Sequence, residues 1–343
     1  MAVLVTFFNN VFLHMEFGYM SKLFDNESRI PSRKPRLGIS ACLLGQPVRF
    51  DGGHKQDSFI QTSLASHIEC VPVCPEVEAG FAIPRPTMQL RLRGEDTRLV
   101  MSKGEHEDVT QKMTDFASKK MKELSWLDGF IFKKNSPSCG AFRVPVVINK
   151  HGYREKNGTG VFAKTFMQRY PLIPVEEEGR LNDAGIRENF IERVFAYQRW
   201  KEVDNSVQGL TGFHSRHKLM LMARGSHYYQ ELGRFVAETT AKNLSQRRDM
   251  YIHRFMRVMK AIPSNGKQTN VLLHIMGYLK KALSHEDKKE LLEVFEAYRQ
   301  QQLPLITAVT MLRHYLRLYP QPYIEQQHYL TPFPEQLALR SVI

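Results

Sequence analysis

Three cysteines form the strongest chemical signal in this sequence, because each lies in a short turn of small residues. Cys42, Cys74 and Cys139 are flanked by Gly, Ser or Pro, and each follows a short apolar run that predicts a β-strand. In an open α/β sheet, the loops at the carboxyl ends of the strands form the ligand site. Three thiolates that meet there can hold a metal ion or an iron–sulfur cluster and leave one coordination position open, as in catalytic sites.

The spacing of the cysteines disfavours other uses. No CxxC pair occurs, which argues against a zinc ribbon or finger. Four cysteines in 343 residues are sparse for disulfides, and we expect no secretory segment before them. We interpret the fourth, Cys70, as a small buried hydrophobic residue. Neither a Gly-x-Gly-x-x-Gly motif nor a P-loop occurs, so no nicotinamide or flavin is indicated.

Five short motifs in the first half resemble the TudS thiouracil desulfidase family. They occur in the family's order, at residues 40–45, 49–54, 73–76, 83–86 and 136–140. The resemblance covers roughly residues 35–180. It implies that Cys42, Cys74 and Cys139 hold a [4Fe–4S] cluster, whose fourth iron lacks a protein ligand and binds the sulfur of a thiolated uracil.

The chemistry of such a site requires proton transfer beside a soft metal centre. Thiocarbonyl sulfur prefers thiolate-ligated iron to hard cations, and binding there polarises the C–S bond so that water can add to the carbon. Glu76 is the candidate acid/base, two residues beyond Cys74. Ser136 and Ser138 can donate hydrogen bonds to cluster sulfurs or to the base. We expect substrate contacts from Arg85 and Lys134. Asp51 is a further candidate contact, but its sequence context favours a turn residue.

A basic segment in the second half indicates a polyanionic partner. The net charge of the chain is +13. Residues 216–281 contain thirteen Lys/Arg and only three acidic residues. Tyrosines interleaved with these cations are typical of a nucleic-acid-binding surface. A solvated basic helical face is the alternative. We expect tRNA contacts from Arg216, Lys218, Arg224, Arg247, Arg248, Lys280 and Lys281.

Periodic apolar residues predict that this half is a bundle of five or six helices, with runs over 243–262, 268–283, 285–301 and 303–319. Residues 214–221 and the tyrosine-rich tail resemble the YbgA-like domain. A desulfidase domain fused to this domain resembles the RudS group, bacterial enzymes that remove sulfur from 4-thiouridine in tRNA. In that group the appended domain helps to bind the tRNA.

The predicted organisation is a Rossmann-like α/β catalytic domain followed by an all-α domain. We expect a leader at 1–34 that is disordered or a start-site artefact, the desulfidase domain at 35–180, a connecting helix and linker at 181–211, and the helical tRNA-binding domain at 212–343. We expect a cytoplasmic protein without a membrane segment. The sequence is compatible with a monomer and with a homodimer.

Three functional hypotheses follow. The first is a cluster-dependent desulfidase of 4-thiouridine in tRNA, which releases sulfur through the open iron without net oxidation. The second is a desulfidase of free thiouracil or another thiolated nucleobase. The third is a non-catalytic iron–sulfur sensor that binds nucleic acid, for which Cys70 is the available fourth ligand.

Overall fold

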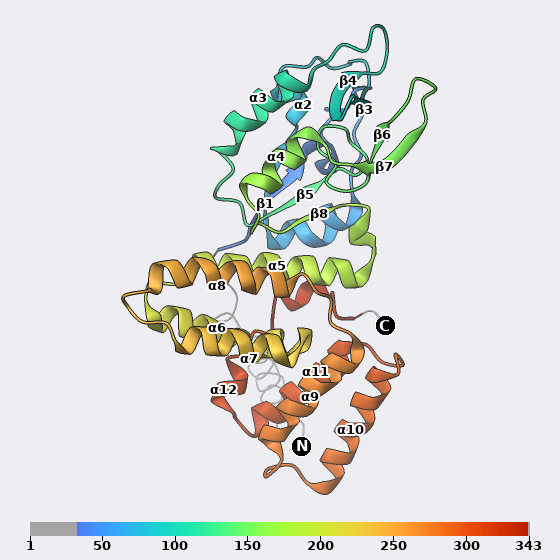
Figure 1. Ribbon diagram of the computed structural model, residues 1–343. Helices are drawn as coiled ribbons and strands as arrows, with labels where there is room; N and C mark the ends of the chain where they lie inside the picture. The colour runs from blue at the N-terminus through green and yellow to red at the C-terminus, as the bar shows by residue number, and fades with distance from the viewer. Residues whose placement is uncertain (1–32, 342–343) are drawn as a thin grey trace, which may run out of the picture. The chain divides into compact units, whose positions relative to one another are not determined.

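The computed structural model describes residues 33–341 as an α/β domain followed by an all-helical domain (Figure 1). This order confirms the predicted fold class. The expected leader lies outside the described residues except for its last two positions. No helix of the described chain combines the length and the apolar composition needed to cross a lipid bilayer.

A four-stranded parallel sheet forms the centre of the α/β domain. Its strand order is β2-β1-β5-β8, with bounds Glu69–Val73, Arg36–Ser40, Gly129–Phe132 and Val175–Glu177. The chain runs from β1 outward to β2 and then returns to β5 and β8, so its direction of winding reverses between β1 and β5. Open α/β sheets bind ligands at the carboxyl edge beside such a reversal.

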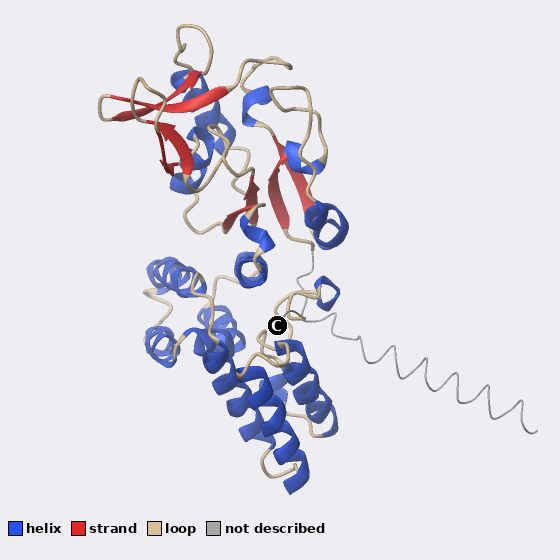
Figure 2. Cartoon of the chain, turned by 90° about the vertical axis from the view of Figure 1, so that its right-hand side faces the viewer, coloured by secondary structure: helices blue, strands red, loops and turns tan. Residues whose placement is uncertain are grey.

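Helices cover both faces of this sheet (Figure 2). On one face, Phe130 and Phe132 pack against α3 and α4. On the other, Leu37, Ile39 and Ile131 pack against the π-helix η3 and against α5. Both faces of the central strands β1 and β5 are buried, which explains why these two strands read as apolar runs. The helix bounds are Thr110–Met121 for α3, Val161–Arg169 for α4, Phe59–Leu64 for η3 and Ala184–Lys201 for α5.

A second, mixed sheet lies in the same domain and was not predicted. Its order is β4-β3-β6-β7, with bounds Asp96–Met101, Met88–Arg93, Val144–Val147 and Arg154–Gly158. The sequence of β7, Arg-Glu-Lys-Asn-Gly, contains no apolar residue. Without apolar alternation, a strand of this kind leaves no periodic signal in the sequence.

The helical domain contains six helices of a dozen residues or more among the described residues, followed by a short one. Four of them match the predicted periodic runs. Their bounds are Val207–Arg224 (α6), Ser226–Ala237 (α7), Leu244–Met259 (α8), Asn265–Leu279 (α9), His285–Arg299 (α10), Leu305–Leu318 (α11) and Pro322–Glu325 (α12). The expected boundary at residue 212 is wrong, because it falls inside α6.

Helix α5 lies in the segment expected to hold a connecting helix, and it is a core element that both domains share. Phe190 and Val194 pack into the core under the parallel sheet, whereas Ala196 and Trp200 belong to the core of the helical domain. Burial on opposite sides leaves α5 without the polar face of an ordinary surface helix. The two domains therefore share one continuous hydrophobic element.

Buried charges on α5 bind it to the helical domain and to the C-terminal segment. Glu192 forms ion pairs with Arg224 of α6 and, at 2.8 Å, with Arg340. Arg340 also pairs with Glu188 at 2.8 Å and donates to the carbonyl of Tyr329. Burial raises the pKa of the Glu192 carboxyl, but the two guanidinium groups outweigh burial and hold that pKa below its ordinary value.

Two buried histidines make the stability of the helical domain depend on pH. Burial, with a smaller contribution from Lys218, lowers the pKa of His214 to about 4. Burial, aided by Arg199, lowers the pKa of His217 well below 6.5. Both rings stay neutral in the fold and take up protons on unfolding, so stability falls as the pH drops below 6.5.

We predict that replacing His217 with Gln reduces this pH dependence. Between pH 7.5 and 5.5, the wild type should lose about 1.4 kcal/mol more unfolding free energy than the variant, the linkage expected for one histidine. Urea denaturation at the two pH values measures the difference. An equal loss in both proteins would show that His217 is protonated in the folded state.

Candidate active site

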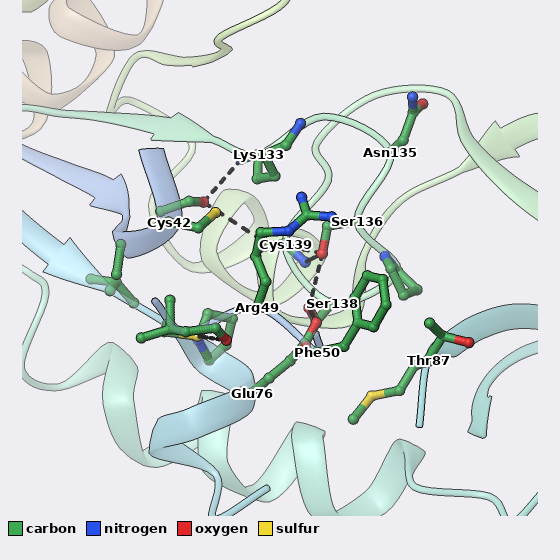
Figure 3. Close-up of a pocket in the computed structure, with 18 of the residues that line it drawn as sticks. Cys42, Arg49, Phe50, Glu76, Thr87, Lys133, Asn135, Ser136, Ser138 and Cys139 are labelled. Carbon is green, nitrogen blue, oxygen red and sulfur yellow. Dashed lines mark hydrogen bonds between the residues drawn. The ribbon is translucent and has the colours of Figure 1, made fainter. Parts of the chain in front are cut away.

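The three expected cysteines line one cavity at the carboxyl edge of the parallel sheet (Figure 3). Cys42 lies in the 3₁₀ turn η2 (Ala41–Leu44) directly after β1. Cys74 follows β2, and Cys139 lies in the loop after β5. The cavity has a volume of about 380 Å³. Three parallel strands thus place three thiols, 97 residues apart at most in the chain, around one space.

The three thiols that line the cavity form no disulfide, and two of them are buried. All four thiols are free, and Cys42 and Cys139 are buried. Burial raises the pKa of Cys42 to about 11 and that of Cys139 to about 12, and it also raises the pKa of Cys74. These thiols are protonated at neutral pH, so a bound metal must displace their protons. Hydroxyl groups of Ser40 and Ser136 lie 3.5 Å and 3.3 Å from the sulfur of Cys139.

The donor set fits a polynuclear cluster better than a single ion. Among residues 33–341, no three His, Cys, Asp or Glu side chains are close enough to share one metal ion. The thiols of Cys42, Cys74 and Cys139 instead surround a cavity, which suits a larger group with several soft metal atoms. Thiolates are the usual ligands of iron–sulfur clusters, and hydroxyl groups beside them adjust the reduction potential.

Cys70 does not belong to this site. It lies within β2 opposite Leu37 and packs, partly buried, against the core on the face covered by α5. It is absent from the lining of the cavity. The sensor hypothesis requires Cys70 as a fourth cluster ligand, and Cys70 does not line the cavity that holds the other three cysteines.

Glu76 lies in the cavity, held between a serine and an arginine. It belongs to the short helix α2 (Pro75–Glu78) that begins directly after Cys74. One carboxylate oxygen accepts a hydrogen bond from Ser138, whose hydroxyl is 3.0 Å from that of Ser136. The other oxygen accepts two hydrogen bonds from Arg85. These contacts fix the orientation of the carboxylate beside two of the cysteines.

Two of the expected substrate contacts have structural roles instead. The guanidinium of Arg85 is occupied by Glu76 and by the carbonyls of Val48 and Ala82, and its side chain is only 4% exposed. Arg85 therefore positions Glu76 and cannot also bind a phosphate. Asp51 is not in the lining; it accepts a hydrogen bond from the backbone N–H of Gly53 at 3.1 Å and stabilises a turn.

The cations that face the cavity are partly different from those expected. Lys134 lines the cavity as expected, is exposed and has no ion pair in the described structure. Lys133, which was not selected, also lines it but is paired with Glu178. Arg49 and Phe50 were missed as well, although both belong to one of the five motifs. The sequence feature that could have identified these two residues is the neighbouring cation and aromatic ring within that motif.

The residues expected to contact tRNA in the helical domain divide into two groups. Arg224 is 1% exposed and paired with Glu192, so that expectation is wrong. Arg247 stacks on Phe235 and pairs with Glu238, and Arg248 stacks on Trp200 and donates to two carbonyls of the loop before α6. All three are structural. Arg216, Lys280 and Lys281 are exposed, and Lys218 is partly exposed beside Tyr229.

Two regions of the chain match known families. Residues 37–178 match the family described as 2-thiouracil desulfurase, and residues 218–334 match one described as a protein of unknown function (DUF1722). YbgA of Escherichia coli K12, described as uncharacterized, is 31% identical over 153 residues, which are 43% of this chain and 90% of that protein. The chain belongs to the YbgA family. The first match adds a thiouracil desulfidase domain before the YbgA-like part, which confirms the expected fusion and supports a desulfidase enzyme.

Among solved structures, the chain is similar to TudS, which is described as a [4Fe-4S]-dependent thiouracil desulfidase. The two are 28% identical, and the match covers 43% of this chain and 94% of that chain with a TM-score of 0.35.

A close backbone contact with Gly160 fixes the loop that bears Ser138 and Cys139. The N–H of Gly160 donates to the carbonyl of Gly140 at 2.7 Å. A Cβ atom at residue 160 would lie 2.6 Å from the carbonyl group of Ser138 and 2.8 Å from the nitrogen of Cys139. These neighbours are backbone atoms and cannot rotate away.

We predict that replacing Gly160 with Ala displaces this loop. Overpacking of this kind costs about 1–3 kcal/mol, and Cys139 should react faster with a maleimide in reduced, iron-free protein. Peptide mass spectrometry measures the rate at Cys139. Gly277→Ala in α9 is the control, because a Cβ there meets nothing within 4 Å. An unchanged rate at Cys139 in the Gly160 variant would contradict the tight contact.

Proposed function

We propose that this protein is an iron–sulfur-dependent desulfidase that converts 4-thiouridine in tRNA to uridine. The observation that carries this proposal is the arrangement of Cys42, Cys74 and Cys139 around one cavity. Among the described residues that line it, Glu76 has the single carboxylate. The 2-thiouracil desulfurase match over the same part of the chain supports the class of reaction.

The proposed reaction replaces sulfur with oxygen without net oxidation. The oxygen of water bonds to the thiocarbonyl carbon, the carbon–sulfur bond breaks, and uridine and hydrogen sulfide are the products. Cys42, Cys74 and Cys139 would hold a [4Fe–4S] cluster, which when bound supplies an open iron, a soft Lewis acid suited to thiocarbonyl sulfur.

The protein residues would orient the reactants and move protons. Glu76 accepts the proton of the attacking water at the oxygen that Ser138 contacts, and Ser138 with Ser136 forms a short chain of hydroxyls for its transfer. Arg85 keeps the other carboxylate oxygen in place. The partly apolar lining, including Phe50 and Met88, excludes bulk water from the nucleobase.

A tRNA substrate accounts for the positive charge of the helical domain. After the structural arginines are set aside, several cations between residues 216 and 281 remain exposed and without ion pairs in the described part of the chain. These are Arg216, Arg234, Lys242, Arg257, Lys260, Lys280 and Lys281. A free thiobase carries no phosphate for such a surface to bind, whereas tRNA offers one at every nucleotide.

The decisive experiment is anaerobic reconstitution with iron and sulfide, followed by incubation with bulk bacterial tRNA and nucleoside mass spectrometry. We expect 4-thiouridine to disappear with an equal gain of uridine. Cys42→Ala should abolish both iron incorporation and activity. Cys70→Ala is the matched control and should keep both, because Cys70 lies outside the cavity.

Each other result has a defined meaning. Unchanged 4-thiouridine in the presence of an intact cluster, together with turnover of free 4-thiouracil, would replace tRNA by the free nucleobase as substrate. Loss of the cluster in Cys70→Ala would restore the sensor hypothesis. Full activity of Cys42→Ala would contradict the proposed ligand set.

We predict that Glu76→Gln keeps the cluster and lowers turnover by about 10²–10⁴-fold, the usual contribution of a general base. The amide can still accept the hydrogen bond of Ser138 but cannot take up the proton. Single-turnover rates and iron content measure the two properties separately. Glu69→Gln, at an exposed ion pair with Arg36 at the start of β2, is the control and should keep the wild-type rate. A fully active Glu76→Gln enzyme would exclude Glu76 as the base.

A further inference from the structure

A second cavity lies between the α/β domain and helix α8, with a volume of about 510 Å³. Its α/β wall comes from β8, from the segment before it and from Phe142, and its opposite wall comes from α5 and α8. Phe142 follows Cys139 by three residues, and its N–H is bound to the β8 carboxylate of Glu177 at 3.1 Å. The cavity is therefore joined to the active-site loop through Phe142, whose backbone N–H binds the side chain of Glu177.

Arg193 of α5 lines this cavity without an acidic partner. Its side chain is 8% exposed, and its Nε donates to Asn189 at 3.0 Å. No carboxylate in residues 33–341 lies within ion-pair distance of its guanidinium, whereas Arg224 and Arg340 nearby are both paired. The two terminal nitrogens of Arg193 have no hydrogen-bond acceptor in the described structure, although the residue lines an open space.

Burying the Arg193 guanidinium without an ion-pair partner costs folding free energy. A buried cation loses its hydration, and for Arg193 the longer-range attraction of Glu176 does not outweigh that loss. Burial accordingly lowers the pKa of Arg193 to about 10. A planar guanidinium offers parallel N–H donors that match the oxygens of a phosphate. An anion in the cavity would supply the missing acceptors.

Helix α8 adds two more cations to the same cavity. Arg257 lies in the last turn of α8, and Lys260 is the C-cap residue three positions later, so both line the cavity from the same end of the helix. Both are exposed and free of ion pairs in the described chain. The cavity lining holds one carboxylate, Glu176, which Arg180 neutralises at 2.6 Å. The lining therefore holds four Lys/Arg side chains, Arg180, Arg193, Arg257 and Lys260, against this single carboxylate, so positive charge is in excess.

We propose that this cavity binds a phosphate group, and that the ligand is a backbone phosphate of the tRNA. The second part of this inference rests on the proposed function. The phosphate would contact Arg193 at the bottom of the cavity and Arg257 and Lys260 at its rim. Because the cavity adjoins the Cys139 loop, binding there would position the RNA strand beside the site of chemistry.

The test is the salt dependence of binding to an unmodified tRNA transcript, measured by fluorescence anisotropy with the reconstituted full-length protein. The double variant Arg257→Gln/Lys260→Gln should bind about tenfold more weakly at moderate salt. Its slope of log affinity against log salt concentration should be shallower by about one. Arg193→Gln should act in the same direction, with its melting temperature measured to verify folding.

The matched control is Lys119→Gln/Lys122→Gln. These lysines are also exposed, three residues apart at the C-terminal end of a helix, and free of ion pairs in the described chain. The control should leave the slope unchanged. Equal slopes for the two double variants, or no measurable binding of the transcript by the wild type, would overturn the backbone-phosphate assignment.

Inorganic phosphate separates the two sources of the ligand. If millimolar phosphate raises the melting temperature of the wild type but not of Arg257→Gln/Lys260→Gln, while the RNA slopes are equal, the cavity binds a free phosphate and not RNA. If phosphate does not raise the melting temperature of the wild type and the RNA slopes are also equal, the anion site itself is refuted. Because the transcript contains no sulfur, its binding is measured independently of the reaction. A slope change here, together with unchanged 4-thiouridine in the assay with bulk tRNA, would support the phosphate site and contradict only the proposed reaction.

Discussion

The structure depends on the burial of α5 on two sides. Phe190 and Val194 complete the core beneath the parallel sheet, while Ala196 and Trp200 complete the core of the helical domain. Removing either partner would expose a broad apolar surface on this helix. The ion pairs of Glu192 with Arg224 and Arg340 add a further constraint, because breaking a buried pair on one side leaves a buried charge without compensation. The α/β and helical parts therefore pack as one compact unit in the described chain.

This burial also supports the active site. The sheet is covered by α5 and η3 on one face and by α3 and α4 on the other, so the carboxyl ends of β1, β2 and β5 are held at fixed spacing. The turns after these strands place Cys42, Cys74 and Cys139 around one cavity. The second sheet does not contribute a cysteine, but Thr87 and Met88 at its edge close the cavity opposite the thiols. Glu76 is then oriented by contacts from Ser138 and Arg85, which lie in separate loops.

The arginines illustrate how one residue type serves different purposes in this fold. Arg224 and Arg340 neutralise buried carboxylates, Arg85 orients a carboxylate at the active site, and Arg248 covers Trp200. From the sequence, Arg224 and Arg248 were expected to contact tRNA and Arg85 to contact the substrate. Burial and ion pairing separate these structural groups from the exposed cations and from Arg193, whose environment differs because it is buried and unpaired beside an open cavity.

Local sequence alone determined the parts of this protein that depend on short-range signals. The three cysteine turns, the apolar strands before them, the helices with clear periodicity and the order of the two domains could all be read from neighbouring residues. Tertiary structure decided what depends on distant contacts. The role of α5, the polar strand β7, the ion pairs of Arg85 and Arg224, and the exclusion of Cys70 from the cavity follow from residues far away in the chain. The physical reason is that burial and ion pairing are properties of the packed chain, so an arginine has the same appearance in the sequence whether it lies in a core, in a site or at the surface.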